Sequence, residues 1–170
     1  MIDPHARFDE AFAARAPRLD CRPETPVDSA FLTGLAIACS PLAGTLPEPM
    51  LVQQAEFQHA AHNAAHPRAM QRIVTCGGQP IGRIMVAWEA SESHGVDIAV
   101  LPEARATAAG LHLLRAWLDV VDQLGLSARL EVRADNPAGR IYGRLGFVPV
   151  PDPAGWSPIV TMLRAARALA

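Results

Sequence analysis

The strongest pattern of hydrophobic positions covers residues 107–124. Apolar residues recur there every three or four positions and form two neighbouring helical stripes, one of Leu111, Leu114, Leu118 and Val121 and the other of Leu113, Trp117, Val120 and Leu124. A helix with so wide an apolar surface packs against a sheet. Gly125 follows, where glycine commonly ends a helix. The pattern therefore predicts one long helix lying on the core.

Shorter apolar runs with the alternation of strands occur along the rest of the chain. They lie at 19–22, 71–75, 80–89, 94–101, 128–133, 147–150 and 158–163. Gly77 and Gly78 separate the second and third runs, and paired glycines favour a tight hairpin. In the run 128–133, alternation places Leu130 and Val132 on the buried face. These runs predict a sheet of about seven strands.

A helix start is predicted at Thr25. Pro26 suits the first helical position, and Asp28 completes an acidic variant of the capping box. The face expected to be buried consists of Val27, Phe31 and Leu35.

Two further helices are predicted at 50–66 and 136–146. The first is rich in Gln and His and ends before Pro67, whereas the second opens with Asn136-Pro137. Residues 1–16 are interpreted as an N-terminal extension, at most a frayed amphipathic helix, followed by a single domain over 17–170. The order of elements is not a regular βαβα alternation, so the fold class is α+β with mixed strands.

Composition narrows the class of protein. Half of the residues are hydrophobic and 19% are charged, which indicates a globular domain. No apolar run reaches membrane-spanning length and no signal peptide is recognised. The three cysteines form no C-x-x-C pair, as expected for reduced thiols in the cytoplasm. The formal charge of −2 gives no reason to expect a nucleic acid or a membrane as partner.

All fifteen basic residues are arginine. A phosphate-loop NTPase needs its lysine, and a Schiff-base enzyme needs a lysine amine. The sequence therefore excludes both chemistries.

The segment from Asp97 to Gly110 has the pattern of an anion site. A strand runs into a turn of small residues, and the turn runs directly into the long helix. Such a turn leaves the first N–H groups of the helix unpaired at the positive end of its dipole. A pyrophosphate suits this position. An ordinary strand–loop–helix connection is the alternative for this segment alone.

The second distinctive segment is Asn136-Pro-Ala-Gly-Arg-Ile-Tyr142-Gly-Arg-Leu-Gly146-Phe147. Its short helix projects Tyr142 toward the region beside the preceding strand. A lone tyrosine of this kind is otherwise a half-buried packing residue.

Together the two segments closely resemble the GNAT superfamily of N-acetyltransferases, over roughly residues 73–163. The resemblance implies a mostly antiparallel mixed sheet, splayed in the middle and flanked by about four helices. It also implies transfer of an acetyl group from acetyl-CoA to a primary amine, directly within a ternary complex. The acceptor is a small molecule or a peptide, and a homodimer is left open.

The resemblance also assigns residues to the site. The turn binds the pyrophosphate through backbone amides, and the splayed strand pairs with the pantetheine arm and the thioester. A residue of the short helix donates a proton to the departing thiolate, and that residue is Tyr142. The positions that match cofactor contacts are Ile98, Ala99, Val100, Arg105, Ala106, Thr107, Ala108, Ala109, Gly110, Asn136, Ala138 and Tyr142.

The chain departs from the family pattern in the turn. The family usually has glycine at the position of Ala108 and commonly at that of Ala106, and only Gly110 remains. Alanine keeps its N–H, and helix-like dihedrals would suit it. The departure leaves open a non-catalytic acyl-CoA-binding or regulatory module, and thirdly a domain that has lost CoA altogether.

The general base has several candidates. His94 and Asp97 lie on the strand beside the cofactor, and Glu131 lies on the neighbouring strand. A histidine titrates near neutral pH and suits the role, although a solvated loop position or a structural role explains these residues equally.

Three histidines of the predicted helix 50–66 share one helical face. His59, His62 and His66 are spaced i, i+3 and i+7. No carboxylate or cysteine joins them at a suitable spacing, so we expect a face that is either solvated or lines the acceptor site, and no metal.

Overall fold

The computed structural model describes residues 3–167. The strands are β1 (Asp20–Pro23), β2 (Met70–Cys76), β3 (Gln79–Trp88), β4 (Glu92–Val100), β5 (Ser127–Arg133), β6 (Val148–Pro149) and β7 (Ile159–Arg164). The α-helices are α1 (Pro4–Arg15), α2 (Ser29–Cys39), α3 (Glu48–Ala65), α4 (Ala109–Gln123) and α5 (Ala138–Arg144). Two 3-10 turns precede α2 and α4, namely η1 (Pro26–Asp28) and η2 (Pro102–Thr107).

The strands form one sheet in the order β1-β2-β3-β4-β5-β7-β6. Every neighbouring pair is antiparallel except β4 and β5, which are parallel. These two central strands pair only through Glu92–Gly95 and Ser127–Leu130, and beyond Gly95 they separate. The predicted mixed sheet with a splayed middle is therefore confirmed.

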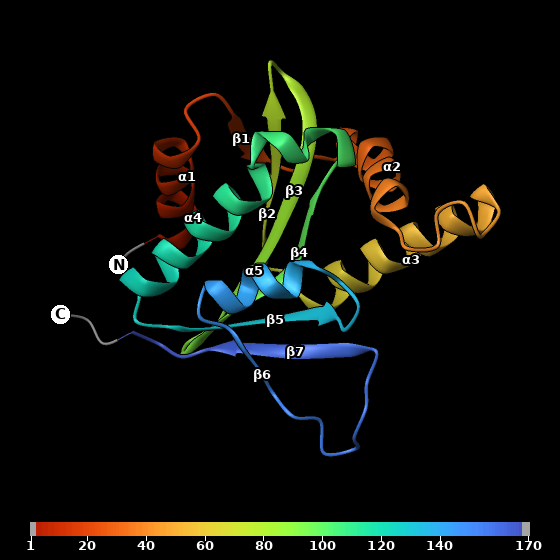
Figure 1. Cartoon of the computed structure of the whole chain (residues 1–170). Coiled ribbons are helices and arrows are strands. Elements are labelled where there is room, and N and C mark those ends of the chain that lie inside the picture. Colours follow the sequence, from red (N-terminus) through yellow and green to blue (C-terminus); the bar gives the residue numbers. More distant parts are fainter. Residues whose placement is uncertain (1–2, 168–170) are drawn as a thin grey trace.

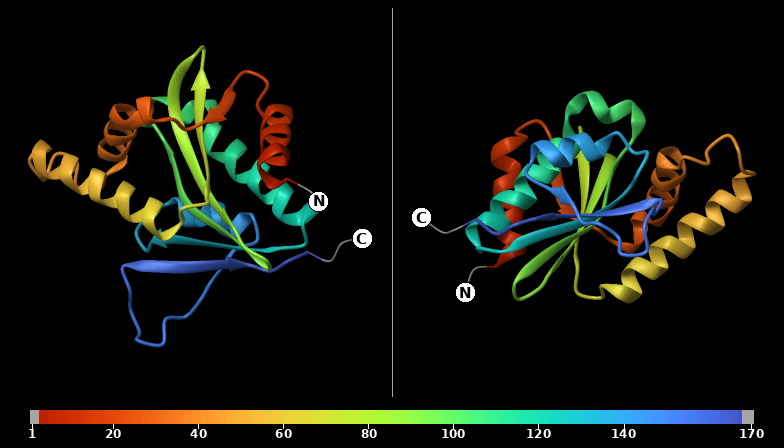
Figure 2. Two further views of the ribbon diagram at one scale, coloured as in Figure 1. Left: turned by 180° about the vertical axis from the view of Figure 1, so that it is seen from behind. Right: turned by 60° about the horizontal axis from the view of Figure 1, so that its bottom comes forward.

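Helices cover both faces of the sheet. Figures 1 and 2 show α1, α4 and α5 on one face and α2 and α3 on the other. Within residues 3–167, no helix combines the length and the apolar character needed to cross a membrane.

The first helix, α1, was not expected as a regular element. It is a full helix whose N-terminus is capped by Asp3, and its Phe8 and Phe12 are completely buried in the same core as α4. Arg15 also forms a two-pronged ion pair with Asp119 of α4. The prediction of a frayed helix was wrong because two buried aromatic rings outweigh the weak overall amphipathicity of the segment.

Helix α4 is fixed to β4 by its tryptophan. Trp117 is fully buried, and its Nε1–H donates to Ser93 Oγ at 2.8 Å. A side chain at Gly95 would place its Cβ 2.8 Å from the Trp117 ring, so glycine is required at that close approach. This contact lies at the last residue pair before β4 and β5 separate.

The predicted capping box at the start of α2 is present. Asp28 Oδ2 accepts from the Thr25 N–H at 2.8 Å, and both Asp28 oxygens accept from Arg22. The predicted apolar face was wrong in part, because Val27 is 87% exposed while Leu32 and Leu35 are buried. The 3-10 geometry of η1 rotates the first residues out of the register of α2.

Candidate active site

The opening between β4 and β5 is the centre of the candidate site. Residues 97–100 of β4 remain paired with β3, whereas residues 96–100 have no strand on their other edge. That edge offers backbone groups to an extended ligand. The side chains of Ile98 and Val100 pack against the core, so these residues present main chain rather than side chain. The end of α2 reaches the same place, where the Cys39 thiol donates to Val100 O at 3.4 Å.

The 3-10 turn η2 connects residues 96–100 of β4 to the N-terminus of α4 (Figure 1). The regular i to i−4 hydrogen bonds of α4 begin at His112, whose N–H donates to Ala108 O at 3.0 Å. The N–H groups of Gly110 and Leu111 come before these bonds and have no acceptor within the helix. The Ala109 N–H donates to Thr107 Oγ1 at 3.3 Å. Donors at the positive end of a helix dipole bind anions.

Ala108 adopts a left-handed backbone conformation, with φ 57° and ψ 17°. It is the one non-glycine residue with positive φ among residues 3–167. The expectation of helix-like dihedrals at this position was wrong, because the turn requires the conformation that glycine adopts freely. Alanine reaches it at a cost of roughly 1 to 2 kcal/mol. The turn thus keeps its glycine-type geometry without glycine.

Helix α5 lies beside β5, across the opening from β4 (Figure 1). Asn136 lies two residues before the helix, and its Oδ1 accepts from the N–H of Ala138, the first residue of α5, at 2.9 Å. Tyr142 packs edge-on against Phe147, with ring centroids 6.1 Å apart. Burial and, second, the negative charge of Asp97 raise the pKa of Tyr142 above its ordinary value. The phenol is therefore protonated at neutral pH and lies close enough to Asp97 to feel its charge.

Asp97 faces the α3 side of the sheet, where an arginine holds it. Arg83 NH1 lies 3.3 Å from Asp97 Oδ2, and the Arg83 side chain is only 6% exposed. The same guanidinium pairs with Glu24 at 3.1 Å and donates to Gln71 Oε1 at 3.0 Å. Sequence reasoning missed this network, although an arginine inside the apolar strand β3 signals a buried charge that needs partners.

His94 is buried near the start of β4, the strand that also carries Asp97. Its Nδ1 lies 3.3 Å from Arg129 NH2 on β5, and its ring stands edge-on to His66 at 5.1 Å. Burial, then the charges of Arg129, His66 and His62, lower the pKa of His94 to about 4. The imidazole is consequently neutral at physiological pH and a weak proton acceptor. Its role as general base stays a prediction that this pKa disfavours.

The buried His94 gives a testable dependence of stability on pH. Its pKa falls from 6.5 unfolded to about 4 folded, so the unfolded chain binds the proton first as the pH drops. Stability is complete above pH 6.5 and decreases toward pH 4, by about 3 kcal/mol if the whole difference is realised. Urea unfolding at both ends of this range should show a smaller decrease for His94→Gln than for the wild type. Equal decreases would contradict the assignment.

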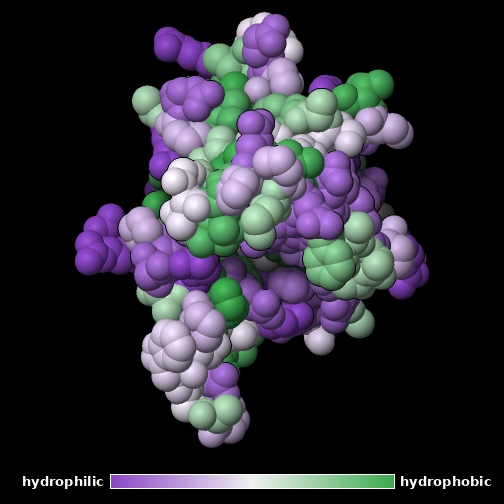
Figure 3. Space-filling model, turned by 90° about the vertical axis from the view of Figure 1, so that its right-hand side faces the viewer, coloured by the Kyte–Doolittle hydropathy of each residue, from purple (hydrophilic) through white to green (hydrophobic). Residues whose placement is uncertain are grey.

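His59 and His62 lie on α3 and His66 is its C-terminal cap, and all three lie near polar side chains of the sheet. His59 Nδ1 lies 3.3 Å from Arg83 NH1, and the pKa of His62 is lowered, mainly by burial. Within residues 3–167, no group of histidine, cysteine and acidic side chains has the arrangement of a metal site. Figure 3 shows this side of the molecule, hollowed below its centre above the projecting β6–β7 loop.

Comparisons with known proteins agree with this geometry. Residues 36–147 match the profile of the Acetyltransferase (GNAT) family. A search of curated proteins finds no match.

Solved structures share the fold at low identity. The PaiA N-acetyltransferase of Thermoplasma acidophilum, solved with coenzyme A, superposes with a TM-score of 0.69 at 16% identity, over 86% of this chain and 98% of that chain. Ard1 of Thermoplasma volcanium gives 0.64 at 23%, over 88% and 99%. The ribosomal-protein-S18-alanine N-acetyltransferase of Escherichia coli gives 0.64 at 19%, over 89% and 96%. With the family profile matching more than half of its residues, the chain belongs to the GNAT acetyltransferase family.

Proposed function

We propose that this protein is an N-acetyltransferase that moves an acetyl group from acetyl-CoA to a primary amine within a ternary complex. The observation that carries the proposal is the opening between β4 and β5, which has the α4 N-terminus at one end and Tyr142 beside it. A half-free strand can hold the thioester arm, a helix terminus can bind the pyrophosphate, and a protonated phenol can donate a proton to the leaving thiolate.

The residues of the opening suit coenzyme A. Exposed small residues at 106–108 allow phosphate oxygens to approach the backbone, and the N–H groups of Gly110 and Leu111 are the donors we assign to them. The free edge at 98–100 would pair with the amides of the pantetheine arm, which places the thioester near Asp97 and Tyr142. We assign the capping turn at Asn136–Ala138 to the opposite wall.

The transfer then proceeds in balanced steps. An acceptor ammonium loses one proton to solvent, and the neutral nitrogen attacks the thioester carbonyl carbon. The C–S bond breaks, sulfur leaves with the bonding electrons, and the Tyr142 hydroxyl supplies its proton to the thiolate. The second nitrogen proton passes through water and returns the tyrosine to its phenol form. Asp97, fixed by Arg83, stabilises the cationic acceptor before attack.

Ala108 favours one alternative, a non-catalytic acyl-CoA-binding module. Its methyl group stands where the family's glycine leaves space for phosphate. The two functions differ in turnover but not in binding.

Two measurements test the proposal. Calorimetric titration with acetyl-CoA and with CoA measures binding, and a thiol-release assay over a panel of amines measures transfer. We expect saturable binding and amine-dependent release of CoA. Binding without release by any amine would support the binding module, and the absence of binding would overturn both.

A further inference from the structure

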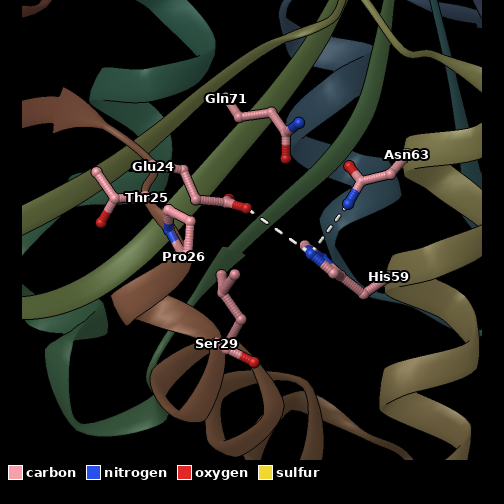
Figure 4. A pocket seen from close by; sticks show the side chains of 8 residues that line it. Glu24, Thr25, Pro26, Ser29, His59, Asn63 and Gln71 are labelled. Carbon is pink, nitrogen blue, oxygen red and sulfur yellow. Dashed lines mark hydrogen bonds and ion pairs between the residues drawn. The ribbon is translucent and has the colours of Figure 1, made fainter.

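A cavity of about 280 Å³ lies on the α3 side of the sheet, at the end of β1. Residues from the β1–η1 connection, α2 and α3 line it, and Gln71 of β2 joins them. Figure 4 shows Glu24 and His59 pointing toward each other across this space, with Asn63 behind His59.

Glu24 is the unusual member of this lining. Its side chain is only 11% exposed, yet neither carboxylate oxygen accepts a hydrogen bond from residues 3–167. Oε2 is paired with Arg83 by charge alone, at 3.1 Å, and Oε1 lies 3.8 Å from His59 Nε2, beyond hydrogen-bond distance. A buried carboxylate ordinarily accepts several hydrogen bonds. The cavity therefore presents an anion whose donors are missing.

The charge of Glu24 is also incompletely balanced. One guanidinium, that of Arg83, serves both Glu24 and Asp97. The pair of carboxylates thus carries one negative charge in excess, and a bound cation would neutralise it.

The imbalance extends along the face that α3 covers. Two separate ion-pair clusters contribute, one of Glu24 and Asp97 around Arg83 and the other of Glu92 and Glu131 around Arg129. These four carboxylates and two guanidinium groups sum to a charge of −2. Such a surface attracts ligands with more than one positive charge.

The register of the sheet relates the cavity to the reaction centre. The Glu24 N–H donates to Gln71 O, Gln71 pairs with Met85, and Met85 pairs with Asp97. Glu24 and Asp97 are therefore three strand spacings apart in one row, about 14 Å between their Cα atoms. Their carboxylates are closer, because both reach the same guanidinium. An acceptor whose reacting amine lies at Asp97 can therefore place a second group at Glu24 if an aliphatic chain of a few carbons joins the two.

We infer that the acceptor carries a second cationic group, which Glu24 binds in this cavity while the reacting amine lies at Asp97. This inference rests on the proposed function. The ligand chemistry is that of two ammonium groups joined by an aliphatic spacer, as in a free diamine or in a peptide whose lysine follows its N-terminal amine.

Matched amines test the inference. Putrescine and butylamine have the same four-carbon chain and differ in the second ammonium group, as do cadaverine and pentylamine. We expect kcat/KM to be about 10 to 100-fold higher for each diamine, the range of one charged hydrogen bond. A lysine-containing peptide and its norleucine analogue form a third pair, which distinguishes a peptide source from a free diamine. Equal kcat/KM within all three pairs would overturn the inference.

Variants then locate the second group. Glu24→Gln keeps the size of the side chain and should reduce the diamine-to-monoamine ratio to near one, mainly through KM. Glu56→Gln removes the same charge from an exposed position of α3 and should keep the ratio. Should Glu24→Gln fail to fold, Ser29→Lys places an ammonium at the cavity lining and should also abolish the preference. A preference that survives either cavity variant contradicts the assignment to Glu24.

Direct titration separates this inference from the catalytic proposal. Putrescine and butylamine are titrated into the protein without acetyl-CoA. Tighter binding of putrescine that is lost in Glu24→Gln supports the cavity even if no amine is acetylated. Acetylation without any diamine preference supports the catalytic proposal and overturns this inference.

Discussion

Replacing Tyr142 by phenylalanine is expected to reduce kcat by about 10² to 10⁴-fold, the usual contribution of general acid catalysis. The substitution removes one hydroxyl and keeps the ring that packs against Phe147. The raised pKa of Tyr142 keeps the phenol protonated through the physiological range, so the wild type retains its proton donor there. Single-turnover acetylation with the best amine measures the chemical step directly.

The same variant carries its own control. Acetyl-CoA affinity and melting temperature should remain close to those of the wild type, because the hydroxyl makes no hydrogen bond to residues 3–167. A thiol is a fair leaving group even without protonation, since its pKa lies near 8 to 9. A reduction of only about tenfold is therefore the lower limit compatible with acid catalysis. Wild-type turnover from pH 6 to 9 would make Tyr142 a packing residue.

Local pattern was sufficient to predict most of the fold. The wide stripes of α4, the hairpin glycines and the Thr25–Asp28 capping box are signals contained in a few neighbouring residues, and each is confirmed. The resemblance supplied the splayed sheet, which periodicity does not contain. The sequence did not predict α1 as a regular helix, because its amphipathicity is weak and its two phenylalanines are fixed only by tertiary contacts with the core that contains α4.

The candidate site was predictable only in its backbone. The turn at 105–110 and the turn at Asn136 follow from local sequence, and the structure places both beside the opening. The charged network was not predictable in this way, because Glu24 follows β1, Arg83 lies on β3 and Asp97 lies on β4, so the three meet only in the folded protein. Likewise, the low pKa of His94 depends first on its burial in the folded protein and then on the charge of Arg129, which is distant in sequence.

The left-handed backbone of Ala108 affects both the stability of the protein and the proposed anion site. Ala108 is exposed, so its methyl group contributes little to the core, yet its left-handed backbone orients the N–H groups that follow. Glycine would relieve the strain but would also give the unfolded chain more freedom. We therefore expect Ala108→Gly to raise the free energy of unfolding by no more than about 1 kcal/mol. Coenzyme A affinity should stay unchanged or improve, since the methyl group beside the phosphates is removed.

Glutamate at the same position tests the anion site most severely. Two like charges about 4 Å apart near a protein surface repel by roughly 4 kcal/mol, and salt reduces this value. We therefore expect Ala108→Glu to weaken CoA binding by about 100-fold or more, measured by calorimetric titration. Ala108→Gln is the matched control, because it has the same bulk and the same backbone strain without the charge, and its loss should be much smaller. Since Ala108 is exposed, both variants should melt within a few degrees of each other. If the glutamate variant binds CoA as tightly as the glutamine variant, the pyrophosphate does not lie at the α4 N-terminus.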